Sequence, residues 1–359
     1  MRKTFTFQGK RYSVSGNTPE ELYTRLLEKK KSLESGQILL SKSTTVKEWT
    51  EKWLQAYKRP VTSDASFYAY ECRVKIYVYP RIGSYRLMDV KPLHLQQIIN
   101  DASHYSRDHI KKIKYTIEQI FDSAMKNKLL LVNPAEDLVL PAAKTSQRRS
   151  ITEYERKHIL NVAKKNPSGL WIKTMLCCGL RPSETAALQG RHINLKEKTI
   201  TIEAALKRHD NTIGSTKTAA GTRFVPIPDL LMGEFSRLKR QPFEYIFQNR
   251  NGSHMTVSGM RKRWLSFKHD LNVSMGCKTD DAGRITPPYP VADDLVPYCL
   301  RHTYCTDLEK AGVPINIAKY LMGHSDIYTT SRIYTHTDKE SVENARILIN
   351  QRNSNKAIV

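Results

Sequence analysis

Basic side chains that could bind a phosphate group recur in short segments of the second half of the chain. Attack on a phosphodiester builds negative charge on the nonbridging oxygens, and in a site without a metal ion that charge needs fixed cations. Arginine suits this task because its planar guanidinium pairs with phosphate through two parallel hydrogen bonds. Arg181 and Arg301, in the segments Cys178–Glu184 and Leu300–Thr303, are the candidates. An isolated arginine is most often a surface residue, so the hypothesis depends on what accompanies this pair.

Imidazole and carboxylate groups accompany the two arginines. His324 follows Gly323, and an imidazole can donate a hydrogen bond from either nitrogen to a phosphate or to an attacking oxygen. The alternative is an ordinary histidine at a helix cap. Glu184 lies one helical turn after Arg181 and is expected to orient neighbouring groups of the site without reacting itself.

The chain resembles the tyrosine recombinase (phage integrase) family, especially the integrases of conjugative transposons, in the order and approximate spacing of its segments. The matching segments are Cys178–Glu184, Ser215–Thr218, Leu300–Thr303, Leu321–His324 and Tyr334–His336. The likeness covers residues 151–340 well and residues 44–141 more loosely. Each segment alone is a weak indicator, whereas the ordered set is highly specific.

The resemblance implies a reaction and the side chains that perform it. Tyr334 would attack a DNA phosphate and hold one DNA end as a 3′-phosphotyrosine, because a phenol close to cations loses its proton more readily. Lys217 would protonate the leaving 5′ oxygen as general acid. No metal and no other cofactor is implied. Tyr328 stays open as an alternative nucleophile, and Lys207 as an alternative acid.

Tyr298 departs from the commonest pattern of the family, which has a histidine three residues before the second arginine. A tyrosine hydroxyl can still donate a hydrogen bond, but with a pKa of about 10 it is a poor base at neutral pH. We therefore expect Tyr298 to position the phosphate at best. General-base work, if any residue does it, would fall to His324, and His302 is expected to be a buried structural partner.

The charge balance favours a polyanionic partner. The chain of 359 residues has 58 Lys and Arg against 35 Asp and Glu, a net charge of +23 and a pI near 9.7. The excess is spread along the chain, with +4 in residues 1–40, +5 in residues 41–141 and +14 in residues 142–359. Several modules contacting a long track of phosphates would need such a distribution. The alternative is a basic protein without a nucleic-acid partner.

The length predicts two or three domains, and the first half of the chain contains signals for two. Residues Thr4–Ser15 alternate around a Gln-Gly turn and precede a charged helix to about Ser35, which predicts a ββα unit in residues 1–40. This unit is either an arm-type DNA-binding unit or an N-terminal extension without that role. Apolar residues at helical spacing from Thr45 predict a helical domain in residues 44–141, which by the resemblance would be the core-binding domain. Its later helices are expected at about Thr62–Tyr77, Pro92–Ala102 and Ser106–Asn127.

Five basic residues are candidates for DNA contacts outside the catalytic segments. Lys111, Lys112 and Lys114 lie near the start of the helix at about Ser106–Asn127, where a solvated face explains them as well as a phosphate contact does. Residues 142–150 lack a hydrophobic period and predict an interdomain linker that contains Arg148 and Arg149.

Residues 151–340 are expected to form a catalytic domain of mixed α and β structure, with a small sheet from Thr199 to Pro228 between helical layers. Residues 341–359 would be a C-terminal tail, whose apolar spacing at Val342–Ile349 predicts docking on a neighbouring protomer. The predicted fold is therefore multidomain and mainly α-helical, with small β-sheets.

The cysteines and the lack of long apolar segments point to a soluble, intracellular protein, and the resemblance implies a prokaryotic cytoplasm and association with the nucleoid. The six cysteines lack zinc-site spacing, and no run of 18 apolar residues occurs. The expected function is site-specific integration and excision of a mobile element by a homotetramer on double-stranded DNA, with core sites, arm sites, and accessory DNA-bending or excision factors. Two alternatives stay open: a noncatalytic DNA-binding regulator of the same fold, and an enzyme that resembles type IB topoisomerases.

Overall fold

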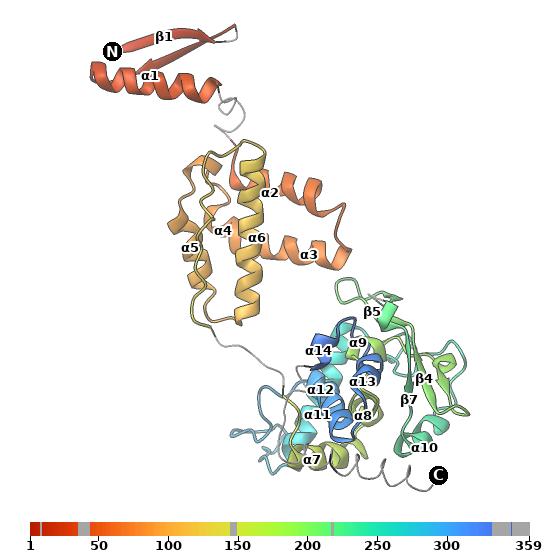
Figure 1. The fold of residues 1–359 in the computed structure, drawn as a ribbon. Coiled ribbons are helices and arrows are strands. Elements are labelled where there is room, and N and C mark those ends of the chain that lie inside the picture. The colour runs from red at the N-terminus through yellow and green to blue at the C-terminus, as the bar shows by residue number, and fades with distance from the viewer. Residues whose placement is uncertain (8, 35–43, 144–148, 217–218, 332–345, 347–359) are drawn as a thin grey trace. The chain divides into compact units, whose positions relative to one another are not determined.

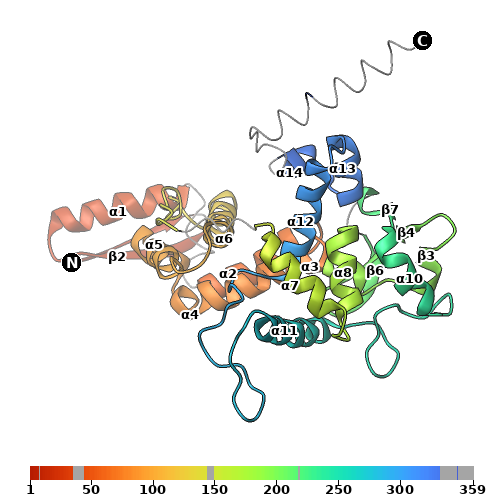
Figure 2. The same ribbon diagram turned by 90° about the horizontal axis from the view of Figure 1, so that it is seen from below.

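The computed structural model describes residues 1–7, 9–34, 44–143, 149–216, 219–331 and 346. The chain divides into two compact units, Met1–Ser146 and Gln147–Val359 (Figures 1 and 2). None of the helices in the described ranges has both the length and the apolar composition needed to cross a membrane.

The N-terminal segment is a hairpin followed by a helix, as its alternating sequence predicts. Strands β1 (Arg2–Phe7) and β2 (Lys10–Ser15) pair antiparallel, and α1 (Pro19–Glu34) follows. Phe5 and Tyr12 face each other across the strands with their rings stacked at 5.8 Å. Leu26 and Leu33 are the buried leucines of α1, so this small unit has a correspondingly small core.

The remainder of the first unit is helical. Its elements are α2 (Val46–Trp53), the π-helical turn η1 (Leu54–Lys58), α3 (Asp64–Arg73), the π-helical turn η2 (Val74–Val78), α4 (Tyr79–Ile82), the 3₁₀ turn η3 (Leu87–Asp89), α5 (Pro92–Asp101) and α6 (Arg107–Lys126). The predicted apolar stripe of α6, from Ile110 to Phe121, is buried. Trp49 of α2 donates its ring N–H to the Ile120 carbonyl at 3.0 Å, which fixes α2 against α6. The α-helix expected to reach Tyr77 ends at Arg73, because the backbone widens into η2 there.

The second unit contains the larger set of helices. These are α7 (Glu153–Ala163), α8 (Gly169–Cys178), α9 (Pro182–Thr185), the 3₁₀ turn η4 (Gly190–His192), α10 (Asp229–Arg237), α11 (Val257–Ser274), α12 (Pro297–Lys310), α13 (Ile315–Met322) and α14 (Ile327–Ser331). Helix α7 begins with a capping box, in which Thr152 and Glu155 satisfy each other's backbone N–H groups.

The strands of this unit form two antiparallel sheets, whereas the sequence predicted one. Strands β3 (Ile193–Asn194), β4 (Thr199–Ile202) and β7 (Arg223–Pro226) form one sheet in the order β3-β4-β7, and β5 (Ala204–Leu206) and β6 (Ile213–Ser215) form a separate hairpin. The 3₁₀ turn η5 (Ala219–Gly221) leads from the hairpin into β7. In β7, Arg223 and Val225 face inward and Phe224 faces solvent.

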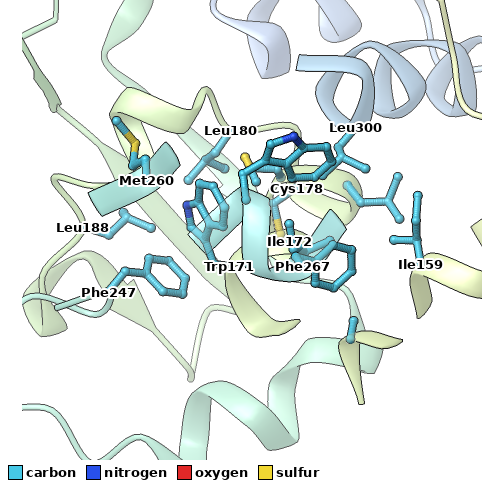
Figure 3. Packing of buried hydrophobic residues seen from close by; sticks show 14 of the residues in the cluster. Ile159, Trp171, Ile172, Cys178, Leu180, Leu188, Phe247, Met260, Phe267 and Leu300 are labelled. Atoms are coloured by element: carbon cyan, nitrogen blue, oxygen red, sulfur yellow. The ribbon is translucent and has the colours of Figure 1, made fainter. Parts of the chain in front are cut away.

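Helix α8 lies at the centre of the second unit's core. Its Trp171 and Ile172 pack with Phe267 of α11 and Leu300 of α12 (Figure 3). Each of these four residues is at most 1% exposed. Because α8 is enclosed in this way, the chain that leaves its C-terminus starts from a fixed point, and that exit leads directly to Arg181.

Candidate active site

Arg181 is placed by the end of α8. Gly179 stops the helix in the left-handed region at φ +65, and a Cβ there would lie 2.1 Å from the ring of Tyr304. The chain then turns extended at Arg181 and enters α9. The Arg181 guanidinium donates to Glu184 at 2.5 Å and to the Gly323 carbonyl at 2.8 Å. Its side chain keeps 27% exposure, so it borders solvent from a fixed position.

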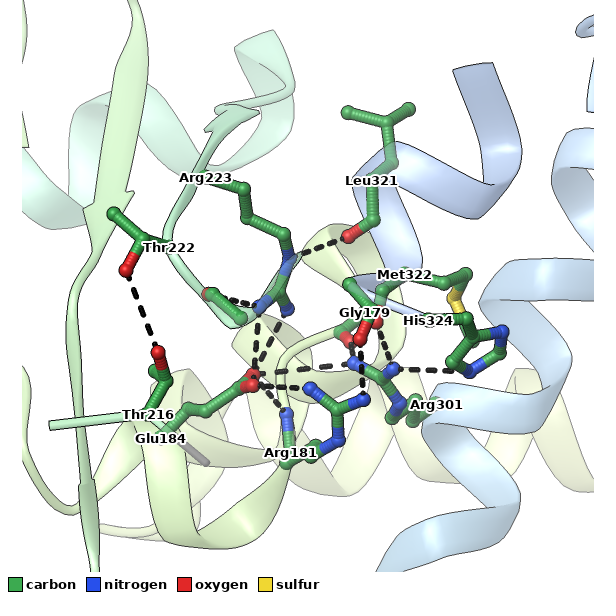
Figure 4. A network of polar contacts seen from close by, with 12 residues as sticks. Gly179, Arg181, Glu184, Thr216, Thr222, Arg223, Arg301, Leu321, Met322 and His324 are labelled. Carbon is green, nitrogen blue, oxygen red and sulfur yellow. Dashed lines mark hydrogen bonds and ion pairs between the residues drawn. The ribbon is translucent and has the colours of Figure 1, made fainter. Parts of the chain in front are cut away.

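Arg301 lies on α12 and is almost completely buried, at 4% exposure. It donates to the carbonyls of Gly179 and Met322, and its Nη2 lies 3.3 Å from Nε2 of His324 (Figure 4). Burial above all, together with the charge of nearby Arg181, lowers the pKa of Arg301 to about 9. The two arginines predicted from the sequence are therefore neighbours in space.

Glu184 holds the arginines together. Its carboxylate accepts two hydrogen bonds from Arg223, at 3.0 and 2.9 Å, beside the bond from Arg181, and Arg301 lies 3.9 Å away. Burial raises the pKa of Glu184, but the hydrogen bonds and charge of Arg223, with the charges of the other two arginines, lower it to about 2. The carboxylate is therefore ionised at neutral pH, and the orienting role expected for it fits this geometry.

Arg223 was not among the residues singled out in the sequence. It is 1% exposed, and its Nε donates to the Leu321 carbonyl at 2.8 Å. A strand arginine is usually solvated, so nothing about its type marked it. The sequence did contain one indication. Arg223 lies two and four residues before Val225 and Ile227, and side chains two residues apart on a strand point to the same face, so Arg223 faces the core with them.

The C-terminus of α13 presents three consecutive carbonyls to three different arginines. Leu321 accepts from Arg223, Met322 from Arg301, and Gly323 from Arg181. Such carbonyls lack partners within their own helix, and they form the negative end of its dipole. Gly323 lies in the left-handed region at φ +60, and a Cβ there would approach Arg223 Nη1 to 2.8 Å.

His324 is neutral and bound at both nitrogens. A guanidinium can only donate, so Nε2 accepts from Arg301 and the proton is on Nδ1, which donates to Thr330 Oγ1 at 2.9 Å. Burial, with the charges of Arg301 and Arg181, lowers the pKa of His324 to about 4. General-base work would require the bond from Arg301 to be released. A hydrogen bond from Nε2 to a phosphate oxygen would need the same release and a proton on Nε2, so either role requires His324 to leave this arrangement.

Two other predicted residues flank Arg301 on α12. Tyr298 lies one turn before it, half-buried, and near enough that its phenol influences the pKa of Arg301. His302, expected to be a buried structural partner, is half-buried as well. It follows Arg301 directly, and consecutive residues of a helix point in directions about 100° apart.

Several predicted residues fall outside the described ranges. They are Lys217, Tyr334, Arg148 and, of the predicted tail 341–359, every residue except 346. The competing candidates are described: Lys207 is exposed and its chain lies over Gly214, while Tyr328 of α14 is 66% exposed.

The candidates for DNA contacts differ in their exposure to solvent and in their ion pairs. Lys112 is exposed, Lys111 is half-buried, and Lys114 pairs with Glu118 at 3.2 Å on the same helix face. Arg149 is bound by Glu155 at 2.7 Å and by Asp294 at 3.0 Å, which raises its pKa. It belongs to the second unit as part of the packing around α7, so the linker predicted to extend to residue 150 ends before Arg149.

Two parts of the sequence match known protein families. Residues 149–341 match the phage integrase family, and residues 45–103 match the phage integrase N-terminal SAM-like domain. The first match includes the arginine cluster, which is Arg181, Arg223 and Arg301 around Glu184.

Individual relatives agree with this match. The XerC-like tyrosine recombinase of Caldanaerobacter subterraneus subsp. tengcongensis is 23% identical over 366 residues, which covers 92% of this chain and 89% of that protein. The transposase of transposon Tn916 from Enterococcus faecalis is 25% identical over 287 residues, covering 73% and 67%.

Solved structures share the fold. The integrase of transposon Tn1549, in complex with transposon right end DNA, aligns with a TM-score of 0.68 at 21% identity, covering 84% of this chain and 98% of that one. A lambda integrase dimer bound to a core site aligns with a TM-score of 0.59 at 15% identity, covering 94% of each chain.

Proposed function

Because this chain belongs to the phage integrase family and is a site-specific tyrosine recombinase, we propose that it cleaves and rejoins DNA through a 3′-phosphotyrosine on Tyr334. The observation that carries this proposal is that Arg181 meets Arg301 at the Glu184 carboxylate, with His324 on Arg301, although Arg181 lies more than 100 residues before the other two. Arg181 keeps 27% of its side chain exposed in this cluster, so a positive group is left facing solvent where a phosphate could bind.

The charge of the cluster fits the reaction. Three arginines and one ionised Glu184 leave a net charge of +2 where a phosphodiester with one negative charge would bind. The transition state of attack on that phosphate has a second negative charge spread over its oxygens, so the cluster stabilises it more than the ground state. Arg181 would contact those oxygens, His324 would join it once Nε2 has left Arg301 and carries a proton, and Tyr298 would add a hydroxyl donor.

The bond changes balance without an external energy source. The Tyr334 hydroxyl loses its proton to solvent, its oxygen forms a bond to phosphorus as the bond to the 5′ oxygen breaks, and Lys217 gives a proton to that oxygen. The 5′ hydroxyl of a second strand then attacks the phosphotyrosine and returns its proton to Lys217, and the released Tyr334 oxygen takes up a proton from solvent. The phosphate ester is conserved throughout, so neither step needs a nucleotide.

We propose duplex DNA as the substrate and a tetramer as the working assembly. The Tn1549 integrase has been solved with transposon right end DNA and with circular intermediate DNA, and lambda integrase as a tetramer on a Holliday junction. Residues 44–141 and 151–340 would bind the core sites, residues 1–40 the arm sites, and residues 341–359 a neighbouring protomer. The Tn916 relative favours integration and excision of a mobile element, with accessory DNA-bending or excision factors.

A covalent-adduct assay tests this function. On a nicked substrate that traps the cleaved state, wild type should form a protein–DNA adduct and Tyr334→Phe should bind DNA equally but form none. Tyr328→Phe is the matched control, because Tyr328 is an exposed tyrosine on α14. An adduct that survives Tyr334→Phe and disappears in the control would move the nucleophile to Tyr328.

The same assay separates the two other functions. Absence of any adduct with wild type at its own sites would favour a noncatalytic regulator. Supercoil relaxation on DNA that lacks specific sites would favour a topoisomerase.

A further inference from the structure

We propose that Asn211 is a positioning residue for the general acid, because it fastens the β5–β6 hairpin, whose outgoing strand leads to Lys217, onto the start of α11. This inference rests on the proposed function, in which Lys217 protonates the leaving oxygen. Lys217 follows Thr216 directly, so the hairpin determines where its chain begins.

Asn211 makes two hydrogen bonds to a segment more than 40 residues later. Its backbone carbonyl accepts from His254 Nε2 at 2.7 Å, and its side-chain Oδ1 accepts from the Val257 backbone N–H at 2.8 Å. Val257 is the first residue of α11, where backbone N–H groups have no partner within the helix. Asn211 therefore serves as an additional cap for a helix that already has Thr256 as its own.

The backbone of Asn211 is suited to this contact. It lies in the left-handed region at φ +59, which asparagine adopts more readily than most residues. Its N–H donates to the Lys207 carbonyl at 2.9 Å, so the turn of the hairpin closes on itself while the oxygens of Asn211 face α11. Helix α11 belongs to the core through Trp264, Phe267 and Leu271, and it provides a fixed support.

The other end of the hairpin is fastened near the arginine cluster. The Thr216 N–H donates to the Glu203 carbonyl at 3.3 Å, and its hydroxyl lies 3.4 Å from that of Thr222 (Figure 4). Between these two threonines, the Gly221 carbonyl accepts from Arg223 at 3.1 Å. The segment that contains Lys217 thus leaves from a hairpin anchored at its tip by Asn211 and returns to Arg223, which binds Glu184.

A sulfur substitution in the DNA distinguishes this role from a general structural one. When the bridging 5′ oxygen is replaced by sulfur, the leaving thiolate needs no proton, so a defect in general acid catalysis disappears. We expect Asn211→Gly to lower the rate of single-turnover cleavage about tenfold on ordinary DNA, as loss of one hydrogen bond would, and to cleave the sulfur substrate at the wild-type rate. Lys217→Ala should show the same pattern with a larger loss.

The glycine variant is chosen because glycine keeps the left-handed backbone and the carbonyl bond to His254, and removes only the side-chain cap. Asn211→Asp keeps the acceptor oxygen and should restore most of the rate. The matched control is Asn194→Ala, which removes a side-chain cap at 2.9 Å from the neighbouring β3–β4 turn and should cleave both substrates normally.

Three results would overturn the proposal. They are a normal rate for Asn211→Gly on ordinary DNA, an equal loss on both substrates, and a Lys217→Ala defect that sulfur does not relieve. The last result would leave the phosphotyrosine mechanism intact, because wild type would still form its adduct. If wild type forms no adduct on either substrate, the proposed function fails and the positioning role with it.

Discussion

The substitution Glu184→Gln removes the one negative charge that the three arginines share. Burial raises the pKa of this carboxyl, but Arg223 above all, then Arg301 and Arg181, lowers it from 4.5 to about 2. At about 1.36 kcal/mol per pKa unit, that fall corresponds to about 3 kcal/mol in favour of the ionised, folded form. Glutamine has the same shape, yet it leaves buried guanidinium groups without a counter-charge, which is costly.

We expect Glu184→Gln to reduce the free energy of unfolding of the second unit by about 3 kcal/mol at pH 7. The carboxyl takes up its proton near pH 4.5 in the unfolded chain and near pH 2 in the folded one. Its contribution is therefore present above pH 4.5 and is lost as the pH falls toward 2. The difference between wild type and variant should shrink over the same interval.

Amide hydrogen exchange of peptides from α8 and α12 measures this in the full chain, because it reports opening of the unit that contains them. Asp229→Asn is the control, since Asp229 is 85% exposed in its pair with Lys198 and should change nothing measurable. Protection in Glu184→Gln within about 1 kcal/mol of wild type at pH 7 would refute the reasoning. So would a loss that is the same at neutral and acidic pH.

Two further predictions concern the end of α13. Gly323→Ala should lose about 1–2 kcal/mol of stability in a thermal melt, because its backbone is left-handed and a Cβ would contact Arg223. The control is Gly233→Ala in α10, which has no neighbour within 4 Å and should be neutral or stabilising. Equal stability of both variants would contradict this prediction. The pKa of His324 falls from its ordinary value of 6.5 to about 4 in the folded chain, so below pH 6.5 the unfolded chain binds a proton that the folded chain does not. Wild type therefore loses stability between pH 6.5 and 4, and His324→Gln should lose less over that interval. An imidazole titration by NMR with a midpoint near 6.5 would argue against that.

The sequence predicted much of the site because its residues occur in short ordered segments. Arg181, Arg301, Glu184 and His324 were named from those segments, and the structure brings all four together. Short sequence segments do not reveal which distant residue a charged side chain pairs with. Arg223 was missed for that reason, since its importance comes from Glu184 and from a carbonyl 98 residues later.

The sequence predicted the fold class and the order of the domains. The structure differs from the prediction where contacts between distant segments determine the arrangement. The ββα unit and the stripe of α6 follow from local periodicity alone. The strands between Thr199 and Pro228 separate into two sheets because β5 and β6 pair only with each other, while β4 pairs with β3 and β7. Arg149 reads as part of a linker in sequence, and only Glu155 and Asp294 show that it is folded.

The three carbonyls at the end of α13 have an evolutionary consequence. Main-chain oxygens are the same for every amino acid, so the side chains of Leu321 and Met322 can drift without altering what the arginines bind. The length of the helix has no such freedom. One residue inserted or deleted before Leu321 would rotate each carbonyl by about 100° and direct it away from its arginine. Divergent descendants of this chain should therefore accumulate replacements along α13 far sooner than gaps.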